Sequence, residues 1–310
     1  MTHPCRHAEP IVVQRKSAGA AEFLLINKRY ESFLEQTGCT TFHAVWSFAD
    51  GEVIKEKGER SVIRVKFPAA ADADPDECQY PDRIPFFYIK KHRQHLSLWQ
   101  RLHGILRPAH ADGEGIKEFF NYCGFRQHGL ATASPVAAGM RFTSFFKADS
   151  FLITRDFFPL VALEDIILQH PATLQGAENE KKRRNILGAI ARYAGKMHAS
   201  GMNQKDFNAT HLLLREPDAA LPEVALFDLQ RVDRNPLNRW RWPIKALAEL
   251  NCTLPSTIFA EQDRKFLFKA YKDKEILSSF DQWQYRLICR KTESIARHTK
   301  KRGLAPKMTY

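Results

Sequence analysis

The stretch Met202–Leu214, MNQKDFNATHLLL, and the segment Ala225–Leu229, ALFDL, decide how this chain is interpreted. Each places an aspartate beside an apolar run, and the first places His211 five residues after Asp206. An Asp in a loop can accept a proton from an attacking hydroxyl, and an Asp at the end of a buried strand can hold Mg²⁺ between nucleotide phosphates. The two segments therefore predict a phosphotransferase in which Asp206 is the base and Asp228 is a metal ligand.

The apolar residues around both aspartates predict two short strands that pair with each other. Val224–Phe227 is apolar enough to be a buried strand with Asp228 at its end, and Leu212–Leu214 would pair beside it. His211 then reaches back toward the bound metal ion, at the position where most kinases carry Asn. The alternative is that both aspartates are ordinary loop acids, since Asp is common in turns.

A candidate lysine strand and a candidate glutamate helix precede these segments, in the order that such an enzyme needs. The aromatic and β-branched run FFYIK ends at Lys90 and predicts a strand, on which Lys91 points to the opposite face. Gly115–Tyr122 carries apolar residues at helical spacing and contains Glu118. We expect Lys90 to contact nucleotide phosphates and Glu118 to hold Lys90, with Glu114 as a rival for that role.

A two-stranded hairpin is predicted upstream of the lysine strand. Residues Glu52–Phe67 alternate apolar and polar side chains on both sides of Gly58. A hairpin tip that lies over phosphates would supply backbone N–H donors and positive charge, so Gly58, Arg60 and Ser61 are candidate nucleotide contacts. The alternative is a plain turn, because the segment has no repeated-glycine loop.

Together these segments resemble the lipopolysaccharide core heptose kinase family, bacterial relatives of protein kinases. The resemblance spans roughly residues 40 to 275 and is most specific at His211 and at the Asp-Leu-Gln-Arg sequence that starts at Asp228. Gln204 and Lys205 depart from it, because relatives usually carry His and Arg there. The matching segments are Gly51–Val53, Gly58–Arg64, Tyr88–Arg93, Lys117–Phe119, Ser150–Thr154, Ala199–Asp206, Thr210–Leu214 and Phe227–Arg231.

The resemblance implies an α+β chain with a protein-kinase-like bilobal fold. A small, antiparallel β-rich N-lobe would occupy residues 40–155, and a larger, mainly helical C-lobe would occupy residues 156–310. Residues 1–39 would form an N-terminal extension with a mixed helical stretch at Ala21–Gln36. ATP and Mg²⁺ would bind between the lobes, and the γ-phosphoryl group would pass to a sugar hydroxyl of the lipopolysaccharide core.

The same resemblance implies a role for each remaining site residue. Thr154 would lie at the hinge beside the adenine, Asp228 would carry Mg²⁺ with His211 near it, and Asp206 would align or deprotonate the acceptor. Two rival functions stay open. One is a kinase-like phosphotransferase with a soluble small-molecule acceptor, and the other is a non-catalytic kinase-like scaffold.

Composition restricts the partners and the location. The formal charge of +12 over 310 residues implies an acidic partner, namely nucleic acid, an anionic membrane surface or a phosphorylated glycolipid. No recognisable nucleic-acid module occurs, and six cysteines without paired spacing indicate reduced thiols. No apolar run approaches about 20 residues, and the first residues lack the apolar core of a secretory signal. We expect a monomeric cytoplasmic protein, peripheral to the inner face of the inner membrane, without a nucleic-acid partner.

Three other segments complete the organisation of the chain. Asn185–Ser200 has the apolar spacing of a core helix, and Gly201 suits its C-terminal cap. Residues 68–83 resemble a loop inserted between strands. The basic segment Asp281–Lys301 is either a solvated helix face or an amphipathic helix that meets anionic lipid or the acceptor's phosphates.

Overall fold

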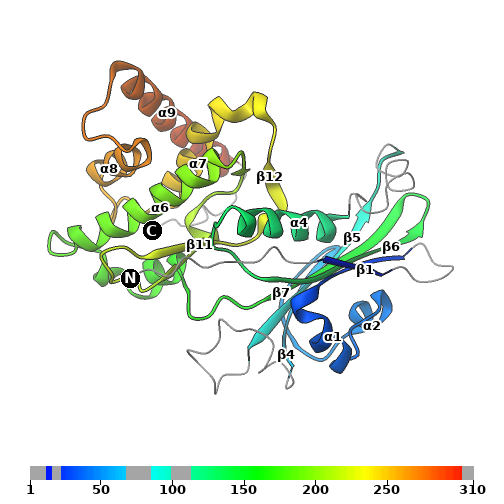
Figure 1. Cartoon of the computed structure of the whole chain (residues 1–310). Helices are drawn as coiled ribbons and strands as arrows, with labels where there is room; N and C mark the ends of the chain where they lie inside the picture. The colour runs from blue at the N-terminus through cyan, green and yellow to red at the C-terminus, as the bar shows by residue number, and fades with distance from the viewer. Residues whose placement is uncertain (1–11, 16–21, 68–84, 99–112, 302–310) are drawn as a thin grey trace. The chain divides into compact units, whose positions relative to one another are not determined.

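The computed structural model describes residues 12–15, 22–67, 85–98 and 113–301 (Figure 1). The chain divides into two compact units, one formed by residues 1–129 and 133–156 and the other by residues 130–132 and 157–310. Each unit contains helices and antiparallel sheet, which confirms the predicted mixed α+β class. The predicted insertion at residues 68–83 lies outside the described residues.

The first unit is built on one antiparallel sheet with strand order β1-β2-β6-β7-β5-β4-β3 among the described residues. Helix α4 covers one face of this sheet, and α1 and α2 cover the other (Figure 1). The bounds are β1 Val12–Arg15, β2 Glu22–Asn27, η1 Lys28–Tyr30, α1 Glu31–Gln36, α2 Phe42–Ser47, β3 Glu52–Lys57, β4 Arg60–Lys66, β5 Phe86–His95, α4 Glu114–Gln127, β6 Pro135–Ser144 and β7 Lys147–Arg155.

Aromatic side chains fill the core between the sheet and α1 and α2. The ring of Phe33 stacks on that of Phe87 with 4.8 Å between centroids, and Phe67 meets both rings edge-on at 5.3 and 5.5 Å. These contacts join α1 to β5 and to the chain that follows β4. Such aromatic pairs add about 0.5–1.5 kcal/mol each to the stabilisation from buried area. They therefore hold β5 against α1.

The prediction of a mixed helical stretch at Ala21–Gln36 is wrong for its first part. Residues Glu22–Asn27 form strand β2, which pairs with β1 on one side and β6 on the other. Phe23–Ile26 is buried on both faces of the sheet. A strand in that position is a continuous apolar run without the period-two alternation that identifies half-exposed strands, so its pattern is compatible with a buried helix. Only Glu31–Gln36 is α-helical.

Helix α4 lies unusually close to the sheet at its first turn. A Cβ atom on Gly115 would lie 2.2 Å from the backbone oxygen of Phe151 in β7, so only glycine fits there. The close approach brings the buried face of the helix, which includes Ile116, Glu118 and Phe119, against the sheet. The helix predicted around Glu118 is therefore confirmed, and its glutamate points into the unit's interior.

The second unit is mainly helical and carries two small antiparallel sheets. One sheet has the order β11-β10-β8, and the other pairs β12 with β9. Among the described residues the elements are β8 Val161–Ala162, α5 Leu163–Gln169, η5 Pro171–Thr173, α6 Glu180–Ala199, β9 Asn203–Gln204, η6 Ala209–His211, β10 Leu212–Arg215, β11 Glu223–Leu226, η7 Leu229–Arg231, β12 Val232–Asp233, η8 Pro236–Arg241, α7 Trp242–Asn251, α8 Glu261–Lys272 and α9 Ser279–Lys301.

Helix α6 leads directly into the predicted catalytic loop. It ends at Ala199, and Gly201 follows with φ of 75°, the left-handed conformation that terminates helices. The predicted strand pair is also confirmed, since Leu212 lies opposite Leu226 and Leu214 opposite Val224. Among the residues that the structure describes, no helix combines the length and the apolar character needed to cross a bilayer.

Candidate active site

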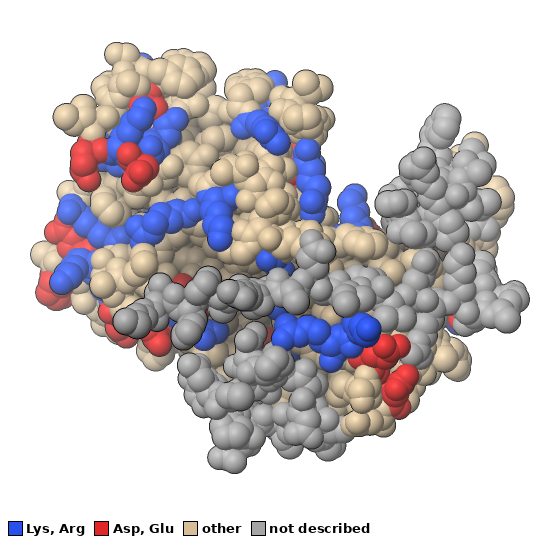
Figure 2. Space-filling model, viewed as in Figure 1, with Lys and Arg blue, Asp and Glu red and all other residues tan. Residues whose placement is uncertain are grey.

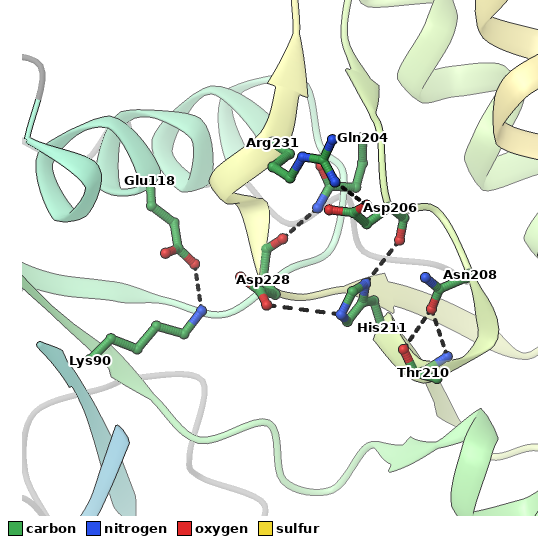
Figure 3. A network of polar contacts seen from close by, with 9 residues as sticks. All are labelled: Lys90, Glu118, Gln204, Asp206, Asn208, Thr210, His211, Asp228 and Arg231. Atoms are coloured by element: carbon green, nitrogen blue, oxygen red, sulfur yellow. Dashed lines mark hydrogen bonds and ion pairs between the residues drawn. The ribbon is translucent and has the colours of Figure 1, made fainter. Parts of the chain in front are cut away.

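The first unit contributes a buried ion pair between its sheet and helix α4. Lys90 projects from β5, and its Nζ lies 2.8 Å from Oε1 of Glu118 in α4 (Figure 3). The Glu118 side chain is 0% exposed and that of Lys90 15% exposed. A carboxylate in such surroundings needs a cationic partner to offset its lost hydration. The pair therefore fixes where the Lys90 ammonium lies.

The two neighbouring charges on these elements have different partners. Lys91 lies on the opposite face of β5, where its Nζ donates to the backbone oxygens of Trp46 and Phe48, both at 2.7 Å. Burial lowers the pKa of Lys91 below its usual value. Glu114 is ion-paired with Arg60, with 2.8 Å between Oε2 and Nη2.

The predicted hairpin and hinge residues lie in regular sheet structure of the same unit. Gly58 has φ of 57° in the tight turn between β3 and β4, where a side chain would be strained. Arg60 and Ser61 follow it on β4, opposite His92 and Lys91 of β5. Thr154 is buried in β7, opposite Tyr88. A nucleotide contact at Gly58, Arg60, Ser61 or Thr154 stays a prediction.

In the second unit, the loop of Asp206 and the loop of Asp228 are joined by backbone and side-chain contacts. Lys205 N donates to Arg231 O at 3.1 Å, and the Arg231 guanidinium lies 2.8 Å from Oδ1 of Asp206. Arg231 ends the family-like segment Phe227–Arg231, whose sequence predicts no role for it. The opposite charges of Arg231 and Asp206 are the sequence signal for an ion pair between them. Whether the pair forms depends on how the two loops pack, which the sequence pattern does not show.

His211 connects the two aspartates (Figure 3). Its Nδ1 lies 2.9 Å from the backbone oxygen of Asp206, and its Nε2 lies 3.9 Å from Oδ2 of Asp228. A carbonyl oxygen only accepts hydrogen bonds, so Nδ1 carries the proton. If the ring is protonated, it forms an ion pair with the Asp228 carboxylate. If the ring is neutral, Nε2 presents a lone pair toward that carboxylate, and the two groups face each other favourably only with a cation or a proton donor beside them.

This donor set fits Mg²⁺ in a nucleotide complex. Mg²⁺ is typically held by one or two carboxylates together with substrate phosphates and retained waters. Asp228 offers a partly exposed carboxylate, while the Nε2 of His211 can accept a hydrogen bond from a water on the ion. Throughout the described ranges, groups of three or more His, Cys, Asp or Glu side chains that could hold a metal by themselves are absent.

Asp228 is held in a strained backbone conformation by Gln204. Its φ of 59° and ψ of 64° are left-handed, a region that costs a residue other than glycine about 1–3 kcal/mol. The amide of Gln204 donates to the backbone oxygen of Asp228, and Val232 pairs with Gln204 in the β9–β12 ladder. Although Gln204 departs from the family pattern, it supplies an N–H donor that supports the conformation of the Asp228 loop.

Asn208 gives the loop between Asp206 and His211 its shape. Its Oδ1 accepts from the backbone N of Thr210 at 3.0 Å and from the Thr210 hydroxyl at 2.6 Å. Ala209 N donates to Oγ1 of Thr253 at 3.0 Å. The turn is therefore fixed by its own hydrogen bonds and by Thr253, which lies just after α7. It directs His211 back toward the aspartates.

A half-buried histidine supports the start of the same loop. His198, at the end of α6, lies 3.0 Å from Oδ1 of Asn203 through Nε2 and 2.9 Å from the Tyr271 hydroxyl through Nδ1. Burial lowers the pKa of His198 to about 4, although the hydrogen bond with Asn203 opposes that shift. The side chain is therefore neutral near neutral pH and joins α6, α8 and β9.

His198 should make stability depend on pH. The pKa of His198 falls from its usual 6.5 to about 4 on folding. Between these two pH values the unfolded chain binds a proton that the folded chain does not. The free energy of unfolding should fall as the pH falls through this window, by about 3 kcal/mol over the whole of it. Urea unfolding of the wild type and of His198→Gln across the window measures the effect. Parallel pH profiles of the two proteins would contradict it.

The fold places the chain in a known structural class. It resembles the solved structure "WaaP in complex with acyl carrier protein" with a TM-score of 0.60 and 22% sequence identity, covering 86% of this chain and 97% of that one. At that identity the likeness concerns the fold, which is a kinase-like fold.

The sequence matches the model of the Lipopolysaccharide kinase (Kdo/WaaP) family over residues 106–271, more than half of the chain. The chain belongs to this family, which confirms the resemblance stated from the sequence. The lipopolysaccharide core heptose(I) kinase WaaP of Pseudomonas aeruginosa is 27% identical over 146 residues, which are 46% of this chain and 53% of that protein. The enzyme of the same name from Escherichia coli K12 is 24% identical over 181 residues, 57% of this chain and 67% of that protein. The matched regions thus span about half to two thirds of these relatives.

Proposed function

We propose that this protein is an ATP-dependent sugar kinase, which transfers the γ-phosphoryl group to a hydroxyl of an inner-core sugar, heptose or a related sugar, of lipopolysaccharide. The observation that carries the proposal is the position of His211, which contacts the backbone of Asp206 and the carboxylate of Asp228. A candidate base and a candidate metal ligand are thereby held in one rigid loop system. Membership of the lipopolysaccharide kinase family supports the choice of acceptor.

Each side chain has a role that follows from its chemistry. Asp206 aligns the acceptor hydroxyl and takes its proton, and Arg231 keeps the Asp206 carboxylate in place. Lys90, fixed by Glu118, neutralises charge on the nucleotide phosphates. Mg²⁺, bound at Asp228, would offset the charge that develops on the transferred group.

The proposal extends to the organisation of the chain and its location. The two compact units act as the N-lobe and C-lobe of a bilobal kinase, with the boundary near residue 155. The net charge of +12 suits work on a lipid-anchored anionic acceptor at the inner face of the inner membrane. We propose a monomer for this role, without a nucleic-acid partner.

The test is transfer of phosphate from ATP to defined acceptors. With Mg²⁺ present, the wild type should phosphorylate purified lipopolysaccharide core lacking its phosphates, and mass spectrometry should place the new phosphate on one inner-core sugar. Removal of Mg²⁺ by a chelator should stop the transfer.

Other results would favour the rival functions. Transfer to a soluble sugar or other small molecule, with none to any core acceptor, would favour a soluble-acceptor phosphotransferase. Absence of both transfer and ATP binding would favour a non-catalytic kinase-like scaffold.

A further inference from the structure

The segment 233–242, DRNPLNRWRW, lies shortly after Asp228 in the chain and presents apolar and cationic side chains to solvent. Leu237 is 80% exposed and Trp240 58% exposed. The Arg241 guanidinium lies 4.7 Å from the centroid of the Trp240 ring, which leaves the rest of the indole accessible. Tryptophan is enriched at binding interfaces because one side chain offers a large apolar face together with a polar N–H.

Hydrogen bonds make this segment rigid. Oδ2 of Asp233 accepts from the Asn238 amide at 3.0 Å and from the Trp242 indole at 3.2 Å. Oδ1 of Asp233 accepts from Asn235 N, and Oδ1 of Asn235 accepts from Leu237 N, each at 3.0 Å. The backbone that carries the exposed side chains is therefore held in place, which lowers the entropy cost of binding a ligand.

The segment 233–242 is attached to the loop of the proposed base. Strand β12 pairs with β9, with Asp233 opposite Asn203, three residues before Asp206. Arg239 lies against the start of that loop, because a Cβ atom on Gly201 would be 2.9 Å from its Nη2. Whatever binds to the segment is therefore bound within the same loop system as Asp206.

The charges here are predominantly positive. Arg234, Arg239 and Arg241 belong to the segment, and its one acid, Asp233, is occupied by internal hydrogen bonds. In Figure 2, Lys and Arg side chains with few acids among them stand where Figure 1 draws this segment in yellow. Arginine pairs with carboxylates and phosphates in bidentate geometry, so an anionic ligand is the complementary one.

We infer that the segment 233–242 binds the anionic oligosaccharide that carries the acceptor hydroxyl. Trp240 packs on the apolar C–H face of a sugar ring, and Arg239 and Arg241 pair with a carboxylate or phosphate on that or a neighbouring sugar. The inference rests on the proposed function and deepens it, because it names the residues that recognise the acceptor. The acceptor hydroxyl must come within hydrogen-bond reach of Asp206. The sugars next to the acceptor sugar then reach the segment 233–242, which is attached to the Asp206 loop.

The test measures direct binding as well as turnover, in solutions without vesicles. The probes are a delipidated inner-core oligosaccharide that carries carboxylate sugars and a neutral oligosaccharide of equal length. Calorimetry should give an affinity for the anionic probe at least about tenfold weaker in Trp240→Ala and in Arg241→Gln than in the wild type. Arg241→Gln should also lose most of the preference over the neutral probe.

Residues outside the proposed site supply matched control variants. Phe145, between β6 and β7, is 52% exposed, and Arg192 is an exposed cation on α6. Phe145→Ala and Arg192→Gln should leave oligosaccharide affinity within about twofold of the wild type. In turnover, Trp240→Ala should raise the acceptor KM while ATP affinity stays unchanged, a split that general loss of folding would not produce.

The outcomes separate oligosaccharide binding by the segment 233–242 from the proposed kinase function. Unchanged affinity for the anionic probe in both segment variants, or no binding of it by the wild type, would overturn the inference. Weakened binding in the variants, with no transfer by the wild type, would keep the inference and remove the proposed kinase function. A separate sedimentation assay with phosphatidylglycerol vesicles tests the membrane alternative. If the two segment variants bind vesicles less well but bind the anionic probe like the wild type, the segment is a membrane surface and the inference is overturned.

Discussion

Asp206→Asn should lower phosphoryl transfer to the core acceptor by about 10²- to 10⁴-fold, the contribution typical of a positioned general base. The substitution keeps the size of the side chain and removes its ability to take a proton. Its ion pair with Arg231 is largely exposed on the arginine side, so the free energy of unfolding should change by no more than about 1 kcal/mol. Initial rates with the core acceptor and thermal unfolding of the same preparation measure both effects.

The matched control breaks the same ion pair from its other side. Arg231→Gln leaves the Asp206 carboxylate intact and frees it to move, so we expect a loss of no more than about tenfold in rate. ATP affinity should be unchanged in Asp206→Asn, because the role proposed for Asp206 concerns the acceptor hydroxyl. Equal losses in the two variants would mean that the ion pair matters and that Asp206 is not the base.

Several elements of the fold could be predicted because their sequence patterns are local. Alternation on both sides of Gly58 predicted the hairpin of β3 and β4, and helical spacing predicted α4 and α6. The short apolar runs predicted the pairing of β10 with β11. Strand β2 was missed because burial on both faces removes the alternation that distinguishes a strand from a helix.

The candidate site could be predicted only in part, for a physical reason. The types and order of Lys90, Glu118, Asp206, His211 and Asp228 could be chosen from their neighbours in sequence. Which of their atoms come into contact depends on how distant segments pack. The spacing of apolar residues along the sequence does not specify that packing.

Two contacts illustrate this limit. The hydrogen bond from Gln204 to the backbone of Asp228 exists because β9 and β12 pair in one register. The ion pair of Arg231 with Asp206 depends on the same pairing. In sequence, Gln204 is a departure from the family motif, whereas in the fold its amide supports the Asp228 loop.

Lys90→Met should impair both stability and activity. The wholly buried carboxylate of Glu118 would lose the ammonium that lies 2.8 Å from it. Removing one partner of a buried ion pair typically costs about 3–5 kcal/mol, since the remaining charge stays out of water. Transfer should fall by about 10²- to 10³-fold as well, because a preorganised charge at the phosphates is lost. Urea unfolding and initial rates measure the two losses separately.

Glu118→Leu and the double variant separate stability from activity. Glu118→Leu leaves the lysine, which is 15% exposed and has a flexible stem that can carry its ammonium toward water. It should therefore cost less stability than Lys90→Met. Replacing both residues leaves neither charge buried, so the double variant should be more stable than Lys90→Met alone.

Activity should follow a different order. All three variants lack a fixed ammonium at this position, so the double variant should regain stability without regaining transfer. Recovery of transfer together with stability would mean that the pair only holds β5 to α4. A Lys90→Met protein as stable as the wild type would mean that Glu118 does not depend on the lysine. The expected result, restored folding with transfer still reduced, assigns the Lys90 ammonium to the reaction.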